Sequence, residues 1–527
     1  MRAIANSSVP LLKGWTQLFR SYKSYLWKAL YPDPPSSPAT LGVGFPGGKI
    51  LMNSVWQQFT LSNLHLYQWR GASYLYRLVG LLQSWRRGSW LMQWAEPMGA
   101  VLVALVFALA PFVSNALVGV LLFAGGAFWV LLTLSDETVY PQRLPLKVTP
   151  IHLLVLLYWN IATVATALSP VKEAAAKGLM KLTLYLLLFA LMARVLRSPR
   201  IRSWMITLFL HVSLIVSIYG LRQWFFRAAA LATWVDPESP SAKLTRVYSY
   251  LGNPNLLAGY LLPAVALSLA AVFVWQRWLP KALALTMFVV NSACLILTFS
   301  RGGWIGFVVF IFVFLVLLVY WYSVQLPPGW RPWAMPVVLG GSVGVIVLAM
   351  LFVEPVRDRV ASIFVGRKDS SNNFRMNVWS SVVEMIRDRP ILGIGPGHNA
   401  FNKIYPQYMR ARFSALSAYS IFMEVLVETG FIGLSCFLWL LIVTFNQGIQ
   451  QLRRLRGSSN PEGFWLVGAI ASMAGMLAHG LVDTVWYRPE VNTLWWLMVA
   501  IIASYYVTPN SDTSTPDGDT LRNFGNG

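Results

Sequence analysis

Long apolar stretches separated by short polar segments follow one another from about residue 98 to residue 507. A helix needs about 20 mostly apolar residues to cross a bilayer, and these stretches come close to that length. We therefore expect an all-α, polytopic membrane protein with about twelve spanning helices. The expected spans are 98–113, 115–134, 151–169, 179–196, 204–225, 254–275, 282–299, 303–323, 334–353, 420–445, 464–486 and 493–507.

The polar segments between and around the spans predict the domain organisation. The longest one after the first span, 354–417, separates the ninth and tenth spans, and we interpret it as a large periplasmic loop within a transmembrane domain over 98–507. Residues 52–97 are interpreted as a cytoplasmic segment and 508–527 as a disordered cytoplasmic tail. Residues 1–51 include a Pro- and Ser-rich stretch. They are interpreted as a disordered or mis-assigned extension, because Met52 would also serve as a start.

Composition supports a membrane protein and excludes a soluble globular chain. Of the 527 residues, 56% are hydrophobic and only 12% are charged, against about 25% charged in soluble domains. The net charge of +22 lies largely in short segments beside the spans. There Lys and Arg act as topology signals, so we expect no nucleic-acid partner. The two cysteines both fall inside spans and offer no metal-ligand spacing, and we expect no metal and no cofactor.

The distribution of basic residues predicts orientation. Arg70, Arg77, Arg86 and Arg87 precede the first span and are expected to keep the N-terminus inside. Alternation of the spans then places the C-terminus inside and 354–417 outside. We expect an inner (plasma) membrane protein with both termini cytoplasmic, with the thylakoid membrane as the alternative location.

Two arginines are candidates for anion binding. Arg301, in S-R-G-G-W, interrupts an otherwise apolar run, and Gly302 and Gly303 allow a tight turn there. Arg375 falls near the start of a predicted helix that Pro390 ends, with Asn372 or Asn373 as N-cap. A cation at a positive helix end is favoured if an anion lies between them. The alternatives are a snorkelling arginine and a solvated one.

The segment G-I-G-P-G-H-N (393–399) carries the third candidate. Three glycines in five residues could form an anion-binding nest, or they could be a plain connector. His398 is the only histidine of the outer segment. It could contact an anion or act as a base near neutral pH, or it could simply be exposed.

Two further pairs of ionisable residues are candidates for a functional role. Glu424 and Glu428 are four residues apart, which places them on one helix face that is otherwise apolar. They could be functional, or they could lie in an exposed first turn. His479 and Asp483, also four apart, lie near the end of a span, where ionisable residues are candidates for a proton or cation relay or for a structural pair.

Taken in order, these motifs resemble the O-antigen ligase and polymerase superfamily of membrane proteins, and most closely the cyanobacterial IctB family of bicarbonate transporters. The motifs that carry the resemblance are G-N-P-N-L-L-A-G-Y-L-L-P (252–263), S-R-G-G-W (300–304), R-M-N-V-W (375–379), D-R-P-I-L-G-I-G-P-G (388–397) and E-x-G-x-x-G (428–433). In the ligases, arginines are thought to hold a lipid diphosphate. Arg301 and Arg375 occupy the matching motif positions, so the resemblance implies this role for them. It also implies a basic histidine where this chain has Tyr419, which is a poor base at neutral pH.

Three functions therefore stay open. The resemblance favours a bicarbonate transporter or transport-associated membrane protein with an outward-facing arginine site. The alternative is a glycosyltransferase of the ligase or polymerase kind that acts on lipid-diphosphate-linked saccharides at the periplasmic face. The third is a scaffold that assists another membrane protein. The expected partners are accordingly membrane lipid, a small anion or a lipid-diphosphate glycan, and a membrane-protein partner. Whether the chain is an enzyme is left open, because the expected histidine is replaced.

Overall fold

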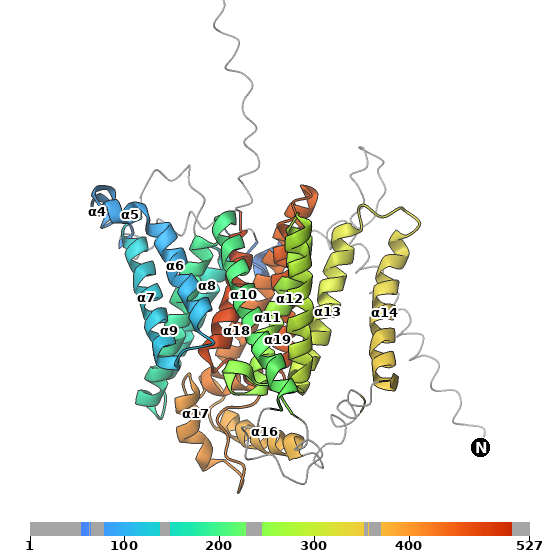
Figure 1. Cartoon of the computed structure of the whole chain (residues 1–527). Coiled ribbons are helices and arrows are strands. Elements are labelled where there is room, and N and C mark those ends of the chain that lie inside the picture. Colours follow the sequence, from blue (N-terminus) through green and yellow to red (C-terminus); the bar gives the residue numbers. More distant parts are fainter. Residues whose placement is uncertain are drawn as a thin grey trace, which may run out of the picture.

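A computed structural model of the chain describes residues 54–62, 64, 78–136, 148–227, 245–352, 357 and 370–507. Our predictions for 1–51, for 508–527 and for most of 354–369 lie outside these residues. The longer elements in the described ranges are all α-helices (Figure 1). They are α4 (Gln83–Gly88), α6 (Ala95–Leu109), α7 (Asn115–Leu134), α8 (Pro150–Ala167), α9 (Lys172–Val195), α10 (Pro199–Phe225), α11 (Pro254–Val274), α12 (Trp278–Leu297), α13 (Arg301–Tyr322), α14 (Arg331–Phe352), α16 (Ser370–Asp388), α17 (His398–Ile404), α18 (Ile421–Gly457), α19 (Gly463–Gly480) and α20 (Pro489–Ser504).

Nine of the described helices are long and apolar enough to cross a membrane. This confirms the predicted all-α, polytopic fold, because in a bilayer the backbone polar groups must be satisfied within the segment itself. Every expected span overlaps a helix. The number of twelve spans, the orientation and the position of 354–417 relative to the membrane stay predictions.

The centre of the bundle is built from α11, α19 and α20, which are buried on most of their surface. Helices α7 and α12 instead leave many apolar side chains exposed, as lipid-facing helices do. Glycines allow the central helices to approach closely. A Cβ on Gly475 of α19 would lie 2.7 Å from the carbonyl oxygen of Gly306 on α13. The two helices therefore cross with their backbones nearly in contact.

Three helices differ clearly from the expected spans in where they begin or end. The span 464–486 ends early, because α19 stops at Gly480 and an irregular segment, 481–488, leads to α20. The span 420–445 is longer, because α18 continues to Gly457 past a kink at Gly430, whose φ is 67°. The span 179–196 begins earlier, at Lys172, where its polar first turn carries the exposed ion pair of Glu173 with Lys177. In each case polar or turn residues near a helix end obscured the boundary.

Helices α16 and α17 lie at one end of the bundle, at the bottom of Figure 1, and we call this end the loop face. They share a small core with the start of α18, which includes Val378, Val382, Phe401 and Val427. The helix predicted before Pro390 is present as α16. It begins at Ser370, so Asn372 and Asn373 lie in its first turn and neither is the N-cap.

The glycine-rich segment 393–397 packs into the kink of α18. The backbone N–H groups of Ile394 and Gly395 donate to the carbonyl oxygens of Val427 and Glu428, at 2.9 Å each. The N–H of Gly397 donates to the Glu428 carboxyl group at 2.7 Å. These donors are committed to α18, so the segment is a structural connector and an anion nest here was the wrong alternative.

Candidate functional site

Arg301 is the first residue of α13, at the loop face. The preceding turn is made at Phe299, whose φ is 49°, and the Ser300 hydroxyl accepts from the N–H of Gly303 at 3.2 Å. Gly302 is therefore helical and does not form the turn that its sequence suggests. Its role is close packing, because a Cβ there would lie 2.5 Å from Cδ2 of His479. Arg301 reaches across to α16, where its Nη1 donates to Oδ1 of Asn372 at 2.8 Å.

Arg375 projects from the second turn of α16 and forms an ion pair with Asp483, with 3.5 Å between Nη2 and Oδ2. The carboxylate is nearly buried and comes from the 481–488 segment. The same Oδ2 accepts from Nδ2 of Asn255 at 2.6 Å. Asp483 therefore joins α16 to the start of α11. His479 and Asp483 do not form a pair on one helix face, because α19 ends between them.

Arg246 is a third arginine of this site that the sequence analysis missed. Its Nη2 donates to Oδ1 of Asn255 at 3.1 Å, and its Nε donates to the carbonyl oxygen of Thr298 at 2.9 Å. Burial lowers the pKa of Arg246 to about 10, and the positive charges of Arg375 and Arg301 act in the same direction against the opposing effect of Asp483. The guanidinium group is thus still charged at neutral pH. Its position just before the 252–263 motif is the sequence feature that could have indicated Arg246 as a site residue.

We call Arg246, Arg301 and Arg375 the arginine cluster. Asp483 forms an ion pair with Arg375 and acts electrostatically on Arg246. Three guanidinium groups therefore lie near one another around this carboxylate. Arginine presents a planar fork of N–H donors that suits phosphate or carboxylate groups. The cluster therefore presents donors at the loop face that suit a phosphate or carboxylate group.

Tyr419 lies beside this cluster in an unusual backbone conformation, with a φ of 50°. Its ring meets that of Phe374 edge to face, with 5.4 Å between centroids. Burial raises the pKa of Tyr419 to about 12, and Asp483 adds to this while Arg375 opposes it. The phenol is neutral at physiological pH, so it can donate a hydrogen bond but cannot accept a proton as a base.

His479 lies at the end of α19, with its ring against Gly302. The side chain is fully buried, and within the described residues neither ring nitrogen has a hydrogen-bond partner. The spacing of His479 and Asp483 in the sequence did not predict this contact with Gly302 of α13.

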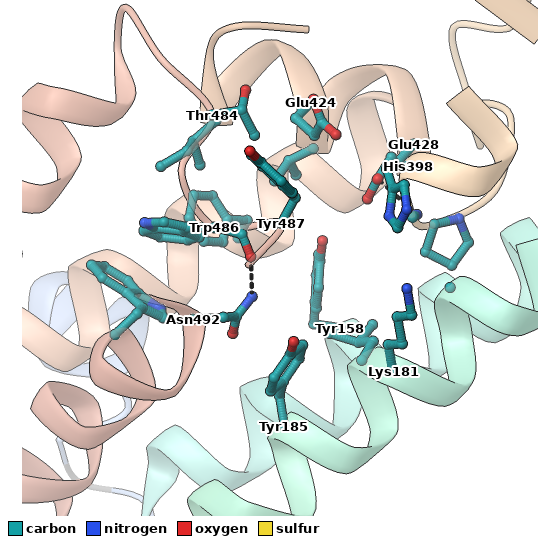
Figure 2. Close-up of a pocket in the computed structure, with 18 of the residues that line it drawn as sticks. Tyr158, Lys181, Tyr185, His398, Glu424, Glu428, Thr484, Trp486, Tyr487 and Asn492 are labelled. Carbon is teal, nitrogen blue, oxygen red and sulfur yellow. Dashed lines mark hydrogen bonds between the residues drawn. The ribbon is translucent and has the colours of Figure 1, made fainter. Parts of the chain in front are cut away.

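A separate cavity of about 150 Å³ lies between α9, α18, α20 and the 481–488 segment (Figure 2). Glu424 and Glu428 line it together, as their spacing on one helix face predicted, and His398 lines it from the start of α17. Arg301 and Arg375 do not line it. Burial lowers the pKa of His398, and the nearby Lys181 lowers it further. His398 is therefore largely neutral at pH 7.

The cavity and the arginine cluster share a wall. Asp483 forms an ion pair with Arg375 of the cluster, whereas the next residue, Thr484, lines the cavity. A second connection runs through Glu424, which lines the cavity. Its Oε2 accepts from the N–H of Ala418 at 2.7 Å, and this bond holds the turn that carries Tyr419. Trp379 Nε1 donates to the carbonyl oxygen of Ala418 at 3.0 Å and ties the same turn to α16.

Comparison with known proteins supports the superfamily. Residues 286–438 match the model of the family described as O-antigen ligase. The match includes Arg301, Arg375 and Tyr419 and ends before the 481–488 segment. No curated protein matches the chain. The protein therefore carries an O-antigen ligase-like domain in a multi-pass helical fold, and nothing in the comparison points to the IctB family or to bicarbonate.

Proposed function

We propose that this protein is a membrane glycosyltransferase of the O-antigen ligase kind, which takes its saccharide from a lipid diphosphate carrier at the loop face. The observation that carries the proposal is the convergence of Arg246, Arg301 and Arg375 from three separate elements of the chain. Membrane lipid and a lipid-linked glycan are the partners that this activity requires.

The chemistry follows from the charge of the cluster. In the reaction, an acceptor hydroxyl oxygen bonds to the anomeric carbon of the donor saccharide, and the bond from that carbon to the diphosphate oxygen breaks. The hydroxyl proton leaves to solvent or a base, and the lipid diphosphate departs with the electron pair. Guanidinium groups positioned in advance around the diphosphate stabilise the negative charge that develops on it.

Tyr419 has a positioning role in this scheme. Its phenol stays protonated at neutral pH, because burial raises its pKa to about 12. It can donate a hydrogen bond to a diphosphate or saccharide oxygen, and it cannot remove the acceptor proton. We therefore expect a slower transfer than in a site with a histidine at this position.

The test is transfer by the purified protein in lipid nanodiscs, with a lipid-diphosphate-linked saccharide as donor and a glycan as acceptor. We expect formation of the joined glycan together with free lipid diphosphate, and loss of both in the Arg301→Ala and Arg375→Ala variants. An unchanged surface glycan profile in a deletion strain, together with no transfer in nanodiscs, would contradict the proposal.

Bicarbonate transport is the second candidate, and Tyr419 is the observation that favours it. A site that retains the arginines and lacks a base can bind a small anion without glycosyl transfer. An inside-negative potential opposes anion entry by about 2.3 kcal/mol per charge per 100 mV, so uptake would need a coupled ion. Labelled bicarbonate flux into proteoliposomes, with and without a sodium gradient, separates the two candidates. No flux under any gradient would reject transport.

A further inference from the structure

A buried glutamine of α10 holds the backbone that carries Arg246 of the arginine cluster. This residue, Gln223, lies in the last turn of α10 and is only 8% exposed. We propose that Gln223 is a positioning residue for Arg246, which fixes the segment 245–252 so that the guanidinium group faces the phosphate ligand of the cluster. The inference rests on the phosphate ligand of the proposed function and not on glycosyl transfer itself. Both residues precede 286–438, so the family match assigns no role to either.

The side-chain amide of Gln223 bonds to the backbone of two consecutive residues. Its Oε1 accepts from the N–H of Tyr248 at 3.1 Å and from the N–H of Ser249 at 2.8 Å. Its Nε2 donates to the carbonyl oxygen of Ser249 at 3.5 Å. Buried backbone groups need a hydrogen-bond partner, and this stretch lies outside any α-helix that would supply one. Without the amide, the segment would have to find other partners in another conformation.

Ser249 shows that α10 imposes the conformation of this segment. Its φ is 48°, a value that residues other than glycine seldom adopt. Such a backbone conformation persists only where the surrounding structure holds it. The Ser249 hydroxyl group donates to the carbonyl oxygen of Val216 at 2.6 Å, and Gln223 bonds to its backbone. Both contacts come from α10, so this helix holds a turn that the sequence itself does not favour.

The effect reaches Arg246 over a short length of backbone. The N–H of Val247 donates to the carbonyl oxygen of Leu297 at 3.2 Å, and Nε of Arg246 donates to that of Thr298 at 2.9 Å. Arg246 therefore runs beside the end of α12 and is two residues from Tyr248, a separation of at most about 7 Å. A change of the backbone at Tyr248 would shift Arg246 relative to these partners and to the rest of the cluster.

The test is isothermal titration of the full-length protein in nanodiscs with inorganic diphosphate. Gln223→Met keeps an unbranched side chain of similar length and removes the amide. We expect it to weaken diphosphate binding about ten-fold, as we also expect for Arg246→Gln. The double variant should bind no more weakly than Arg246→Gln alone, because the effect of Gln223 passes through Arg246. A general loss of structure would instead add to the loss caused by Arg246→Gln.

The pH dependence gives a second measure of positioning. Burial lowers the pKa of Arg246 to about 10, so wild-type affinity should fall as the pH rises through that value. In Gln223→Met, a guanidinium group that no longer faces the ligand contributes little to binding at any pH. We therefore expect this fall to be absent or much smaller in the variant. A merely structural role would weaken binding at every pH and leave the fall in place.

Gln276→Met is the matched control, because Gln276 is exposed and its Nε2 also donates to a backbone carbonyl oxygen, that of Val274, at 3.2 Å. It should bind diphosphate like the wild type. If Gln223→Met does not fold, Ser249→Gly tests the same segment. Glycine adopts the φ of Ser249 without strain, but it removes the hydroxyl contact and frees the backbone. We expect weaker binding here too, and only while Arg246 is present.

The outcomes separate this inference from the proposed function. Wild-type binding with unchanged affinity in Gln223→Met and Ser249→Gly would overturn the inference alone. Additive losses in the double variant would do the same, because Gln223 would then act independently of Arg246. No binding of diphosphate by the wild type would overturn the proposed ligand and this inference with it.

Discussion

Arg375 on α16 forms an ion pair with Asp483 on the segment between α19 and α20, with 3.5 Å between Nη2 and Oδ2. The side chains are 16% and 9% exposed, so the pair is largely shielded from solvent. It joins the loop-face helix α16 to the centre of the bundle. The pair therefore both anchors α16 and moderates the positive charge of the arginine cluster.

Asp483→Asn should have opposite effects on stability and on anion binding. The amide can still accept from Asn255, whereas Arg375 loses the negative charge of Asp483, which we expect to destabilise the fold by about 1–3 kcal/mol. The net positive charge of the site rises by one, so inorganic diphosphate should bind more tightly and restore stability. Thermal unfolding with and without diphosphate measures both effects. Glu173→Gln, in an exposed pair, is the control, and equal unfolding temperatures for Asp483→Asn and wild type would contradict this role.

Arg246→Lys should be nearly as damaging as Arg246→Ala. The guanidinium group donates to Asn255 and to the carbonyl oxygen of Thr298 at once, and a lysine ammonium group does not reproduce this planar fork. We expect glycosyl transfer in nanodiscs to fall about 10²-fold in both variants, the cost typical of losing one donor that stabilises developing charge. A lysine variant with wild-type transfer would show that only the charge matters.

The pH dependence of diphosphate binding should reveal Arg246. Burial lowers the pKa of Arg246 to about 10, so its charge is complete well below pH 10 and is lost as the pH rises through that value. We expect diphosphate affinity in the wild-type protein to fall between about pH 9 and pH 10.5. Isothermal titration across this range measures it, with Arg246→Gln as the control. If the variant shows the same fall, another group is responsible.

Tyr419→His should raise the rate of glycosyl transfer. Burial raises the pKa of Tyr419 to about 12, so the wild-type phenol keeps its proton throughout the working range. An imidazole with an ordinary pKa of about 6.5 would accept the acceptor proton above that pH. We expect a rate that rises between about pH 6 and pH 7.5 in the variant only. Tyr419→Phe separates this effect from a change in packing, and a histidine variant no faster than the phenylalanine variant would contradict it.

The apolar pattern predicted the helices because a bilayer leaves the backbone few alternatives to a helix. It also placed Glu424 and Glu428 on one face, since that relation is local to a single helix. Contacts between distant segments were not predictable in this way. Arg246 joins the cluster only because Asp483 links Asn255, at the start of α11, to Arg375 on α16. The end of α19 at Gly480 lies within a run that stays largely apolar. The glycine spacing at 393–397 is compatible with an anion-binding nest. In the fold, however, the backbone N–H groups of this segment donate to α18 and are not available to an anion.

Gly302→Ala should disturb the cluster without touching any charged group. A Cβ at Gly302 would lie 2.5 Å from Cδ2 and 3.1 Å from Nε2 of His479, a side chain that is fully buried and has little room to move. Helix α13 would have to shift from α19 and carry Arg301 with it, which we expect to destabilise the protein by about 1–3 kcal/mol and to weaken diphosphate binding. Gly340→Ala on α14 is the matched control, because its Cβ would meet no atom within 4 Å. Thermal unfolding and diphosphate titration test the pair, and similar values for both alanine variants would show that the contact of Gly302 with His479 does not position Arg301.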